Sequence, residues 1–201
     1  MQGLEWILAS HNPGKAEEFQ RLLAPYGVEI ASAFVGEAEV VPETGQSYAE
    51  NAALKAVYVA RRLGRPALAD DSGLEVDALA GRPGLYSAHY KSADPAENLR
   101  AVLMETVDVP WERRTCRMRA VVVLAWPDGR QASAEGVVEG HLGFVPRGLR
   151  GFGYDPGFVL ADGRTMAELT AREKDQSSHR GRAVRALMQR LGRGETAVSD
   201  F

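Results

Sequence analysis

The sequence predicts an α/β fold, because segments typical of buried strands alternate with segments typical of amphipathic helices. An apolar segment from Leu4 to Ala9 indicates a first strand, and apolar side chains then recur at helical spacing from Ala16 to Leu23. A second strand is expected over residues 28–32, and a second helix begins after Ser47. This alternation favours helices packed against a central sheet.

The length of the chain fits one domain, or two lobes that share a core. A chain of 201 residues buries roughly 70% of its unfolded surface, so it needs no covalent staple. Cys116 is the only cysteine, which rules out an intrachain disulfide and favours a reducing compartment. We find no internal repeat, low-complexity segment or interdomain linker.

The formal net charge of -3 argues against a general nucleic-acid binder. The first residues lack the basic start and apolar core of a signal peptide, and no apolar run approaches the ~18 residues of a membrane helix. We therefore expect a cytoplasmic protein that binds neither nucleic acid nor membranes.

The junction after the first strand has the composition of an anion-binding site. Its sequence is Ser10-His11-Asn12-Pro13-Gly14-Lys15, and a helix follows. A strand-to-helix junction directs backbone amides and the positive end of the helix toward a ligand, and Asn12 and Lys15 add donors suited to phosphate. The pattern is not a Walker loop, and an ordinary capped turn with a solvated lysine is the alternative.

The second predicted helix combines small apolar residues with a polar stripe. Ser47 and Glu50 have the spacing of a capping box, and Asn51 and Lys55 lie one turn apart. Glu43 lies just before the helix. These polar groups face either a ligand or the solvent.

Two adjacent carboxylates, Asp70 and Asp71, follow the apolar run Ala67 to Ala69. We expect a buried strand that ends here in a sharp turn at Ser72 and Gly73. Neighbouring carboxylates repel each other and are costly to desolvate, so a divalent cation is a natural ligand. Because strand side chains alternate, only one acid is expected to face the ligand. An Asx-type turn is the alternative.

The middle of the chain predicts a lid-like loop over residues 80–90, a helix over residues 95–107 and a strand pair. The strands cover residues 117–126 and 131–140, with Pro127-Asp128-Gly129 as the hairpin turn, and we expect an antiparallel edge there.

A glycine-rich segment over residues 147–158 alternates with aromatic side chains. Such a loop suits a flat ligand, with Phe152 or Tyr154 stacking on a base, although its aromatic residues could instead fill the core. A last helix follows residues 171–182, whose cationic side chains crowd its first turn against the dipole preference. A nearby anion or carbonyl-rich ligand would relieve that conflict, and a plain basic surface helix is the alternative.

Five motifs in this order resemble the inosine/xanthosine triphosphate pyrophosphatase family, often called Ham1-like, over nearly the whole chain. The motifs are residues 9–15, Glu43-Thr44-Gly45 with residues 50–56, residues 69–74, residues 152–156, and Ser178-His179-Arg180. The resemblance implies one domain over residues 1–201 with two lobes, an elongated mixed sheet flanked by helices and an active-site cleft between the lobes. It also implies a homodimer and the Mg²⁺-dependent cleavage of ITP, dITP or XTP to a monophosphate and pyrophosphate.

The same resemblance implies roles for individual residues. Asp71 would be the general base, Lys55 would act with it on the phosphates, and Glu43 and Asp71 would hold the metal. The triphosphate would contact Ser10, His11, Asn12, Pro13, Gly14 and Lys15. The nucleoside and its base would contact Ser72, Phe152, Gly153, Tyr154, Asp155, Lys174, His179 and Arg180.

Two other functions remain open at this point. A Maf-like pyrophosphatase would prefer other bases, and a non-catalytic nucleotide-binding protein would not need the metal carboxylates. The combination of Glu43, Asp70, Asp71 and Lys55 disfavours the second.

Overall fold

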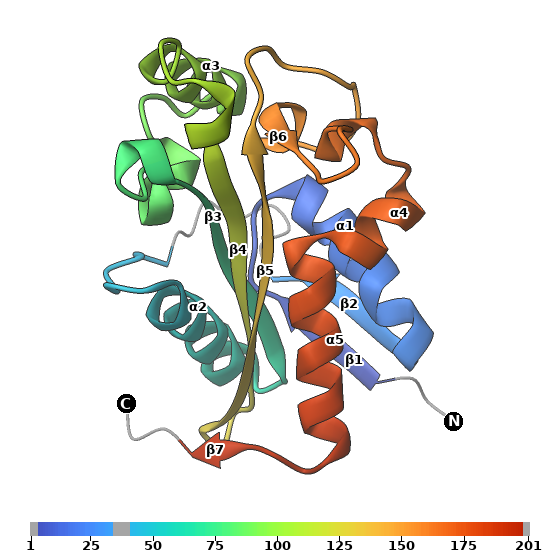
Figure 1. The fold of residues 1–201 in the computed structure, drawn as a ribbon. Coiled ribbons are helices and arrows are strands. Elements are labelled where there is room, and N and C mark those ends of the chain that lie inside the picture. Colours follow the sequence, from blue (N-terminus) through green and yellow to red (C-terminus); the bar gives the residue numbers. More distant parts are fainter. Residues whose placement is uncertain (1–3, 34–40, 199–201) are drawn as a thin grey trace. The chain divides into compact units, whose positions relative to one another are not determined.

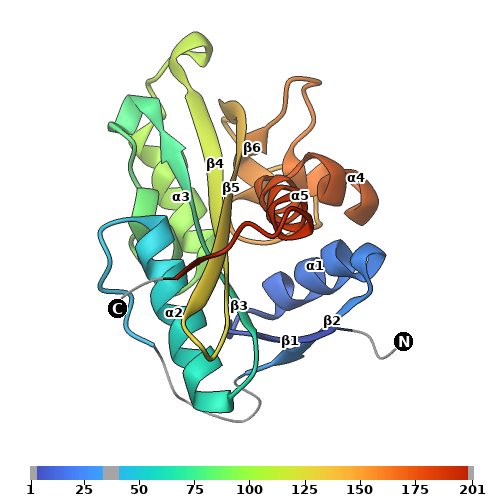
Figure 2. The ribbon, with the colours of Figure 1, turned by 90° about the horizontal axis from the view of Figure 1, so that it is seen from below.

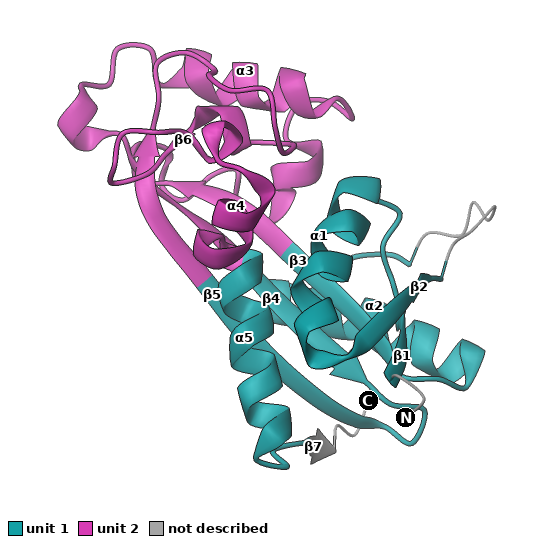
Figure 3. Ribbon diagram, turned by 90° about the vertical axis from the view of Figure 1, so that its right-hand side faces the viewer, with its two compact units in different colours: residues 1–71, 120–136, 180–201 teal, residues 72–119, 137–179 magenta. Residues whose placement is uncertain are grey.

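A computed structural model describes residues 4–33 and 41–198. The chain forms two compact units, coloured separately in Figure 3. Unit 1 comprises residues 1–71, 120–136 and 180–201, and unit 2 comprises residues 72–119 and 137–179. The chain therefore passes from one unit to the other four times.

Unit 1 is built on a mixed sheet. Strand β1 (Leu4–Leu8) lies parallel to β2 (Val28–Ser32) and to β3 (Ala67–Val76), with Leu8 opposite Ser32 on one side and Leu68 on the other. The strand order in this unit is β2-β1-β3-β4-β5, where β4 is Thr115–Ala125 and β5 is Arg130–Leu142. The short strand β7 (Ala197–Val198) pairs with the start of β5.

In the described part of unit 1, three helices cover this sheet: α1 (Pro13–Leu23), α2 (Tyr48–Leu63) and α5 (His179–Gly192). In Figures 1 and 2, α1 and α5 lie on one face of the unit 1 strands and α2 lies on the other. The α1 and α5 face closes over a core that includes Phe19, Leu68, Leu124 and Leu187, all of them buried. The 3-10 turn Ala24–Tyr26 continues α1 into the loop before β2.

Unit 2 contains the second half of β3, the first half of β4, the second half of β5 and the antiparallel strand β6 (Phe158–Val159). Its helices are α3 (Pro95–Glu105) and α4 (Ala171–Ser177). Its core is separate and includes Leu74, Val76 and Met166. Its 3-10 turns are Asp77–Leu79 (η2), Gly84–His89 (η3), Trp111–Arg113 (η4), Asp155–Gly157 (η5) and Met166–Glu168 (η6).

The α/β class with a mixed sheet and flanking helices is confirmed, and so is the hairpin. Gly129 has φ +91, which the turn requires, and its amide donates to the carbonyl of Trp126 over 3.0 Å. The predicted edge is wrong, because β6 and β7 both pair with β5. Two-residue strands are too short to leave a recognisable pattern in a sequence.

The predicted turn at Ser72 and Gly73 is also wrong, because β3 continues through both residues. The physical reason is that Leu74 and Val76 are buried at alternate positions in the core of unit 2, so the two-residue period of the strand continues. The helix predicted over 95–107 ends earlier, at Glu105. No described helix combines the length and the apolar composition that crossing a membrane requires.

Candidate active site

The β1–α1 junction in unit 1 is organised by Asn12. Its side chain caps α1 by accepting a hydrogen bond from the amide of Lys15 over 3.2 Å, and its own amide donates to the hydroxyl of Ser10. The β1–β3 register, with Leu8 opposite Leu68, places this junction beside Asp70 two residues further along β3. The start of an eleven-residue helix therefore lies next to an acidic strand position.

Asp70 is fully buried and binds two cationic side chains. Lys15 Nζ lies 2.9 Å from Asp70 Oδ1, and Arg180 Nε lies 2.9 Å from Asp70 Oδ2. Arg180 Nη1 also reaches the buried carboxylate of Glu18 at 2.9 Å. Burial alone would raise the pKa of Asp70, but the charges of Lys15 and Arg180 outweigh it and hold the pKa well below its usual range.

Asp71 points to the opposite face of β3, toward α2. Its Oδ2 accepts a hydrogen bond from Asn51 Nδ2 over 3.0 Å. Burial raises the pKa of Asp71, the charge of Lys55 and the hydrogen bond from Asn51 oppose that shift, and the charge of Glu43 adds to it. An aspartate with a raised pKa is a better proton acceptor than an ordinary surface aspartate.

Residues before and within α2 surround these acids. Lys55 Nζ donates to the backbone carbonyl of Asp70 over 2.8 Å and forms an ion pair with Glu43. The amide of Gly45 donates to Asn51 Oδ1 over 2.8 Å, and a Cβ at Gly45 would lie 2.6 Å from Glu50 Cβ. The predicted stripe of Asn51 and Lys55 therefore faces Asp70 and Asp71, and only glycine allows the chain to approach so closely.

The glycine-rich loop of unit 2 forms a second group. Asp155 Oδ2 accepts hydrogen bonds from the amide of Phe152 over 2.8 Å and from Lys174 Nζ over 2.6 Å. Lys174 Nζ also lies 4.7 Å from the centroid of the Phe152 ring. The hydroxyl of Tyr154 donates to the carbonyl of Ser87, so Tyr154 anchors its loop to η3.

The predicted site residues thus fall into two groups. Unit 1 brings together Lys15, Glu43, Lys55, Asp71 and Arg180, and unit 2 brings together Phe152, Asp155 and Lys174. Ser72 lies in unit 2 directly after Asp71, and His179 lies there directly before Arg180.

Arg180 lies in unit 1, and its role as a base contact stays a prediction. Its guanidinium binds Asp70 and Glu18, which relieves the crowding of cations in the first turn of α5. Sequence reasoning missed Glu18. The available signal was an acid on the apolar face of α1, four residues before Leu22, where a buried carboxylate requires a cation.

Within the described residues, no group of three or more His, Cys, Asp or Glu side chains is placed to hold a metal ion. Asp71 and Glu43 are nevertheless close enough for the charge of Glu43 to raise the pKa of Asp71. Two carboxylates fit Mg²⁺, which commonly takes one or two protein carboxylates and completes its shell with phosphates and water.

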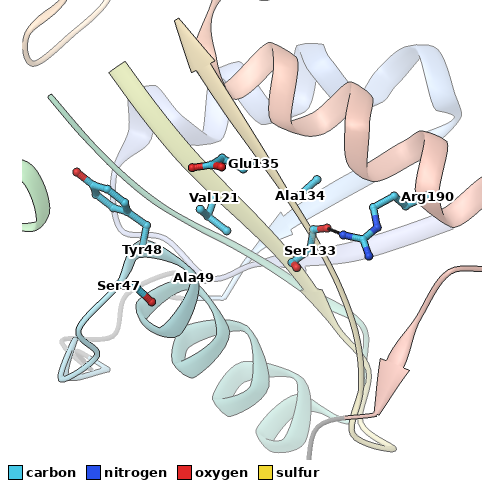
Figure 4. Close-up of a pocket in the computed structure, with 8 residues that line it drawn as sticks. All are labelled: Ser47, Tyr48, Ala49, Val121, Ser133, Ala134, Glu135 and Arg190. Carbon is cyan, nitrogen blue, oxygen red and sulfur yellow. Dashed lines mark hydrogen bonds between the residues drawn. The ribbon is translucent and has the colours of Figure 1, made fainter. Parts of the chain in front are cut away.

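A cavity of about 360 Å³ lies elsewhere in unit 1, beside the first turn of α2 (Figure 4). On one side of it, Arg190 Nη1 donates to the carbonyl of Ser133 over 2.7 Å. Its lining, as far as the structure describes it, includes none of the predicted site residues. The lining residues are Ser47, Tyr48, Ala49, Val121, Ser133, Ala134, Glu135 and Arg190.

The mixed sheet with its flanking helices defines an α/β protein, in which charged side chains cluster beside the β1–α1 junction. The chain belongs to the Ham1 family, whose sequence model matches residues 6–190. It is 46% identical over 185 residues to the dITP/XTP pyrophosphatase of Symbiobacterium thermophilum, covering 92% of this chain and 93% of that protein. It is 45% identical to a dITP/XTP pyrophosphatase of Thermus thermophilus, with coverages of 94% and 92%.

Solved structures agree with this assignment. A HAM1 protein from Coxiella burnetii matches with a TM-score of 0.82 and 38% identity, over 94% of this chain and 99% of that one. The nucleoside-triphosphatase, dITP/XTP pyrophosphatase, from Mycobacterium abscessus matches with a TM-score of 0.71 and 43% identity, over 92% and 99%.

Proposed function

We propose that this chain hydrolyses non-canonical purine nucleoside triphosphates, ITP, dITP, XTP and dXTP, to the monophosphate and pyrophosphate, and so cleanses the nucleotide pool. The observation that carries the proposal is the position of Asp71, a buried carboxylate that Asn51 holds by a hydrogen bond, next to the Asp70 carbonyl that binds Lys55. The names of the relatives support the same reaction.

The triphosphate would bind to unit 1. The amides at the start of α1 and the side chains of Lys15 and Lys55 supply donors and positive charge for phosphate oxygens. The remaining junction residues, Ser10 to Gly14, would also contact the triphosphate. Because Lys15 is already held by Asp70, it is ordered before the ligand binds.

Asp71 would orient and deprotonate the water that attacks the α-phosphorus. Glu43 and Asp71 would hold Mg²⁺, which neutralises charge on the phosphate oxygens when it is bound. Asn51 fixes one oxygen of Asp71 from the α2 side, and Lys55 is fixed by the carbonyl of Asp70. These contacts hold the base and the nearby cation in place.

The base would be recognised by unit 2. Phe152 offers an aromatic face, and the ammonium of Lys174 can donate a hydrogen bond to a 6-oxo group. The 6-amino group of adenine cannot accept that hydrogen bond. Tyr154, Gly153 and Asp155 shape the loop. Ser72, His179 and Arg180 stay proposed contacts.

We propose further that the two units act as lobes of a single domain and that the protein is a cytoplasmic homodimer. Sedimentation at several protein concentrations tests the oligomeric state.

A pyrophosphate-release assay with Mg²⁺ tests the proposed reaction. We expect dITP and XTP to be hydrolysed much faster than ATP, with pyrophosphate as the first product. A preference for pyrimidine or modified bases would instead identify a Maf-like specificity. Binding without turnover would identify a non-catalytic nucleotide-binding protein.

Replacing Lys15 by alanine is expected to weaken the binding of dITP about ten- to a hundredfold, as for the loss of a charge-assisted hydrogen bond of about 1.5–3 kcal/mol. The binding of inosine, which lacks phosphates, should stay unchanged. Isothermal titration of both ligands checks this difference. Lys91→Ala, at an exposed lysine of unit 2, is the matched control, and equal losses for dITP and inosine would exclude the phosphate role.

A further inference from the structure

Arg114 is a fully buried arginine that the proposed reaction does not use. Within the described residues, its hydrogen-bond acceptors are all backbone carbonyls. Nε donates to Leu142 over 2.7 Å, Nη2 donates to Gly143 over 2.7 Å, and Nη1 donates to Thr106 and, over 3.4 Å, to Val109. The guanidinium carbon also lies 4.4 Å from the centroid of the Phe144 ring.

These carbonyls belong to two different parts of unit 2. Thr106 and Val109 lie in the turn that follows α3, and Leu142 and Gly143 lie at the end of β5. The carbonyl of Arg114 also accepts from the amide of Leu142 over 2.8 Å. One planar side chain with a fixed fork of donors therefore joins the end of α3 to the end of β5.

The 3-10 turn η5 contacts both of these parts. The amide of Gly143 donates to the carbonyl of Gly157 over 2.8 Å, which ties η5 to the end of β5. A Cβ on Gly157 would collide with Cδ1 of Leu99, a buried residue of α3. The position of η5 is therefore set by β5 through a hydrogen bond and by α3 through close packing.

The same turn carries the residue that organises the proposed base contacts. Asp155 begins η5, and its carboxylate holds the amide of Phe152 and the ammonium of Lys174. A shift of η5 would therefore move the ring of Phe152 and the ammonium of Lys174 together. The described contacts of Arg114 include neither of them, so any effect on them must pass through Gly143, Gly157 and the end of α3.

We propose that Arg114 is a positioning residue for nucleobase recognition, which fixes η5 and thereby Phe152 and Lys174 through the ends of α3 and β5. The inference rests on the proposed function, because it assumes that Phe152 and Lys174 meet the base. Lysine at position 114 keeps the charge but lacks the forked donors needed to hold four carbonyls.

The test compares a ligand that has a base with one that has only phosphates. For Arg114→Lys we expect the KM for dITP to rise about tenfold, equal to about 1.4 kcal/mol of lost binding. The inhibition constant of inorganic triphosphate, which would contact unit 1 alone, should stay unchanged, and kcat should change little. General destabilisation would weaken both ligands together.

Arg117→Lys is the matched control, because Arg117 lies in β4, three residues after Arg114, and its guanidinium pairs with Asp77 and Glu139 rather than with backbone carbonyls. We expect no selective effect on dITP in this variant. An equal rise in KM for both arginine variants would overturn the proposal, as would equal losses of dITP and inorganic triphosphate in Arg114→Lys.

A second pair of variants decides the question if Arg114→Lys does not fold. Gly157→Ala should raise the KM for dITP selectively, because the new methyl group pushes η5 away from Leu99. Adding Leu99→Ala removes the colliding atom and should restore the KM. No selective effect in Gly157→Ala, or no recovery in the double variant, would overturn the role of η5. If the wild-type protein itself shows no base preference, the proposed function fails first, and the inference fails with it.

Discussion

Asp71→Asn is expected to lower kcat by about 10²–10⁴-fold, the range associated with the loss of a general base. The amide has nearly the same shape and can still accept the hydrogen bond from Asn51, so the fold and the phosphate contacts are retained. Affinity for dITP, measured by equilibrium binding without Mg²⁺, should therefore change little, because the lost proton acceptor acts on the transition state.

The control for this change is Asp128→Asn. Asp128 lies in the hairpin turn, where its carboxylate pairs locally with Arg130, so turnover should match the wild type. Undiminished turnover in Asp71→Asn would remove Asp71 from the mechanism. A parallel loss of affinity and turnover would assign it to substrate binding instead.

Asp70→Asn is expected to destabilise the protein by about 3–5 kcal/mol, because it breaks a buried ion pair and leaves cationic partners behind. Lys15 loses its ion pair with this carboxylate, and Arg180 keeps its ion pair with Glu18. Urea unfolding at pH 7, followed by circular dichroism, measures the loss. The two substitutions should therefore have different effects: Asp70→Asn lowers stability, and Asp71→Asn lowers turnover.

The destabilisation should also depend on pH in a defined direction. The pKa of Asp70 is lower in the folded state than in the unfolded state, so its contribution is present above the unfolded value and is lost as the pH falls through the folded one. The difference between wild type and Asp70→Asn should stay constant near neutrality and narrow below about pH 4, the usual pKa of an aspartate. Asp162→Asn, at an exposed ion pair with Arg164, serves as the control. A difference that widens on acidification would contradict this role.

The local parts of the site could be predicted from the sequence because they depend on short spacings. A capped turn at the β1–α1 junction is one of the two interpretations that the sequence allows, and the stripe of Asn51 and Lys55 follows from the helix period. The motif order also identified the family before any fold was known. The individual catalytic and binding roles stay predictions, since geometry shows contacts and not turnover.

The roles of the adjacent acids could not be assigned from the sequence. Alternation along β3 predicts that Asp70 and Asp71 face opposite ways, but which helix covers which face is a tertiary property. The pairing of Glu18 with Arg180 joins residues 162 positions apart, so no local pattern announces it. The continuation of β3 through Ser72 and Gly73 likewise depends on core residues that bury Leu74 and lie far from it in the sequence.

Unit 1 is assembled from three separate segments, so Arg180, which lies in the third segment, is translated late. Asp70 and Glu18 emerge long before Arg180, which lies 110 residues after Asp70 in the chain. Until that arginine is translated, Asp70 has Lys15 as a counter-ion, but both carboxylates lack the charge of Arg180 and cost more to bury. Stable packing of unit 1 therefore waits for Arg180, and a stalled or truncated product ending before residue 180 would be a ready substrate for proteolysis.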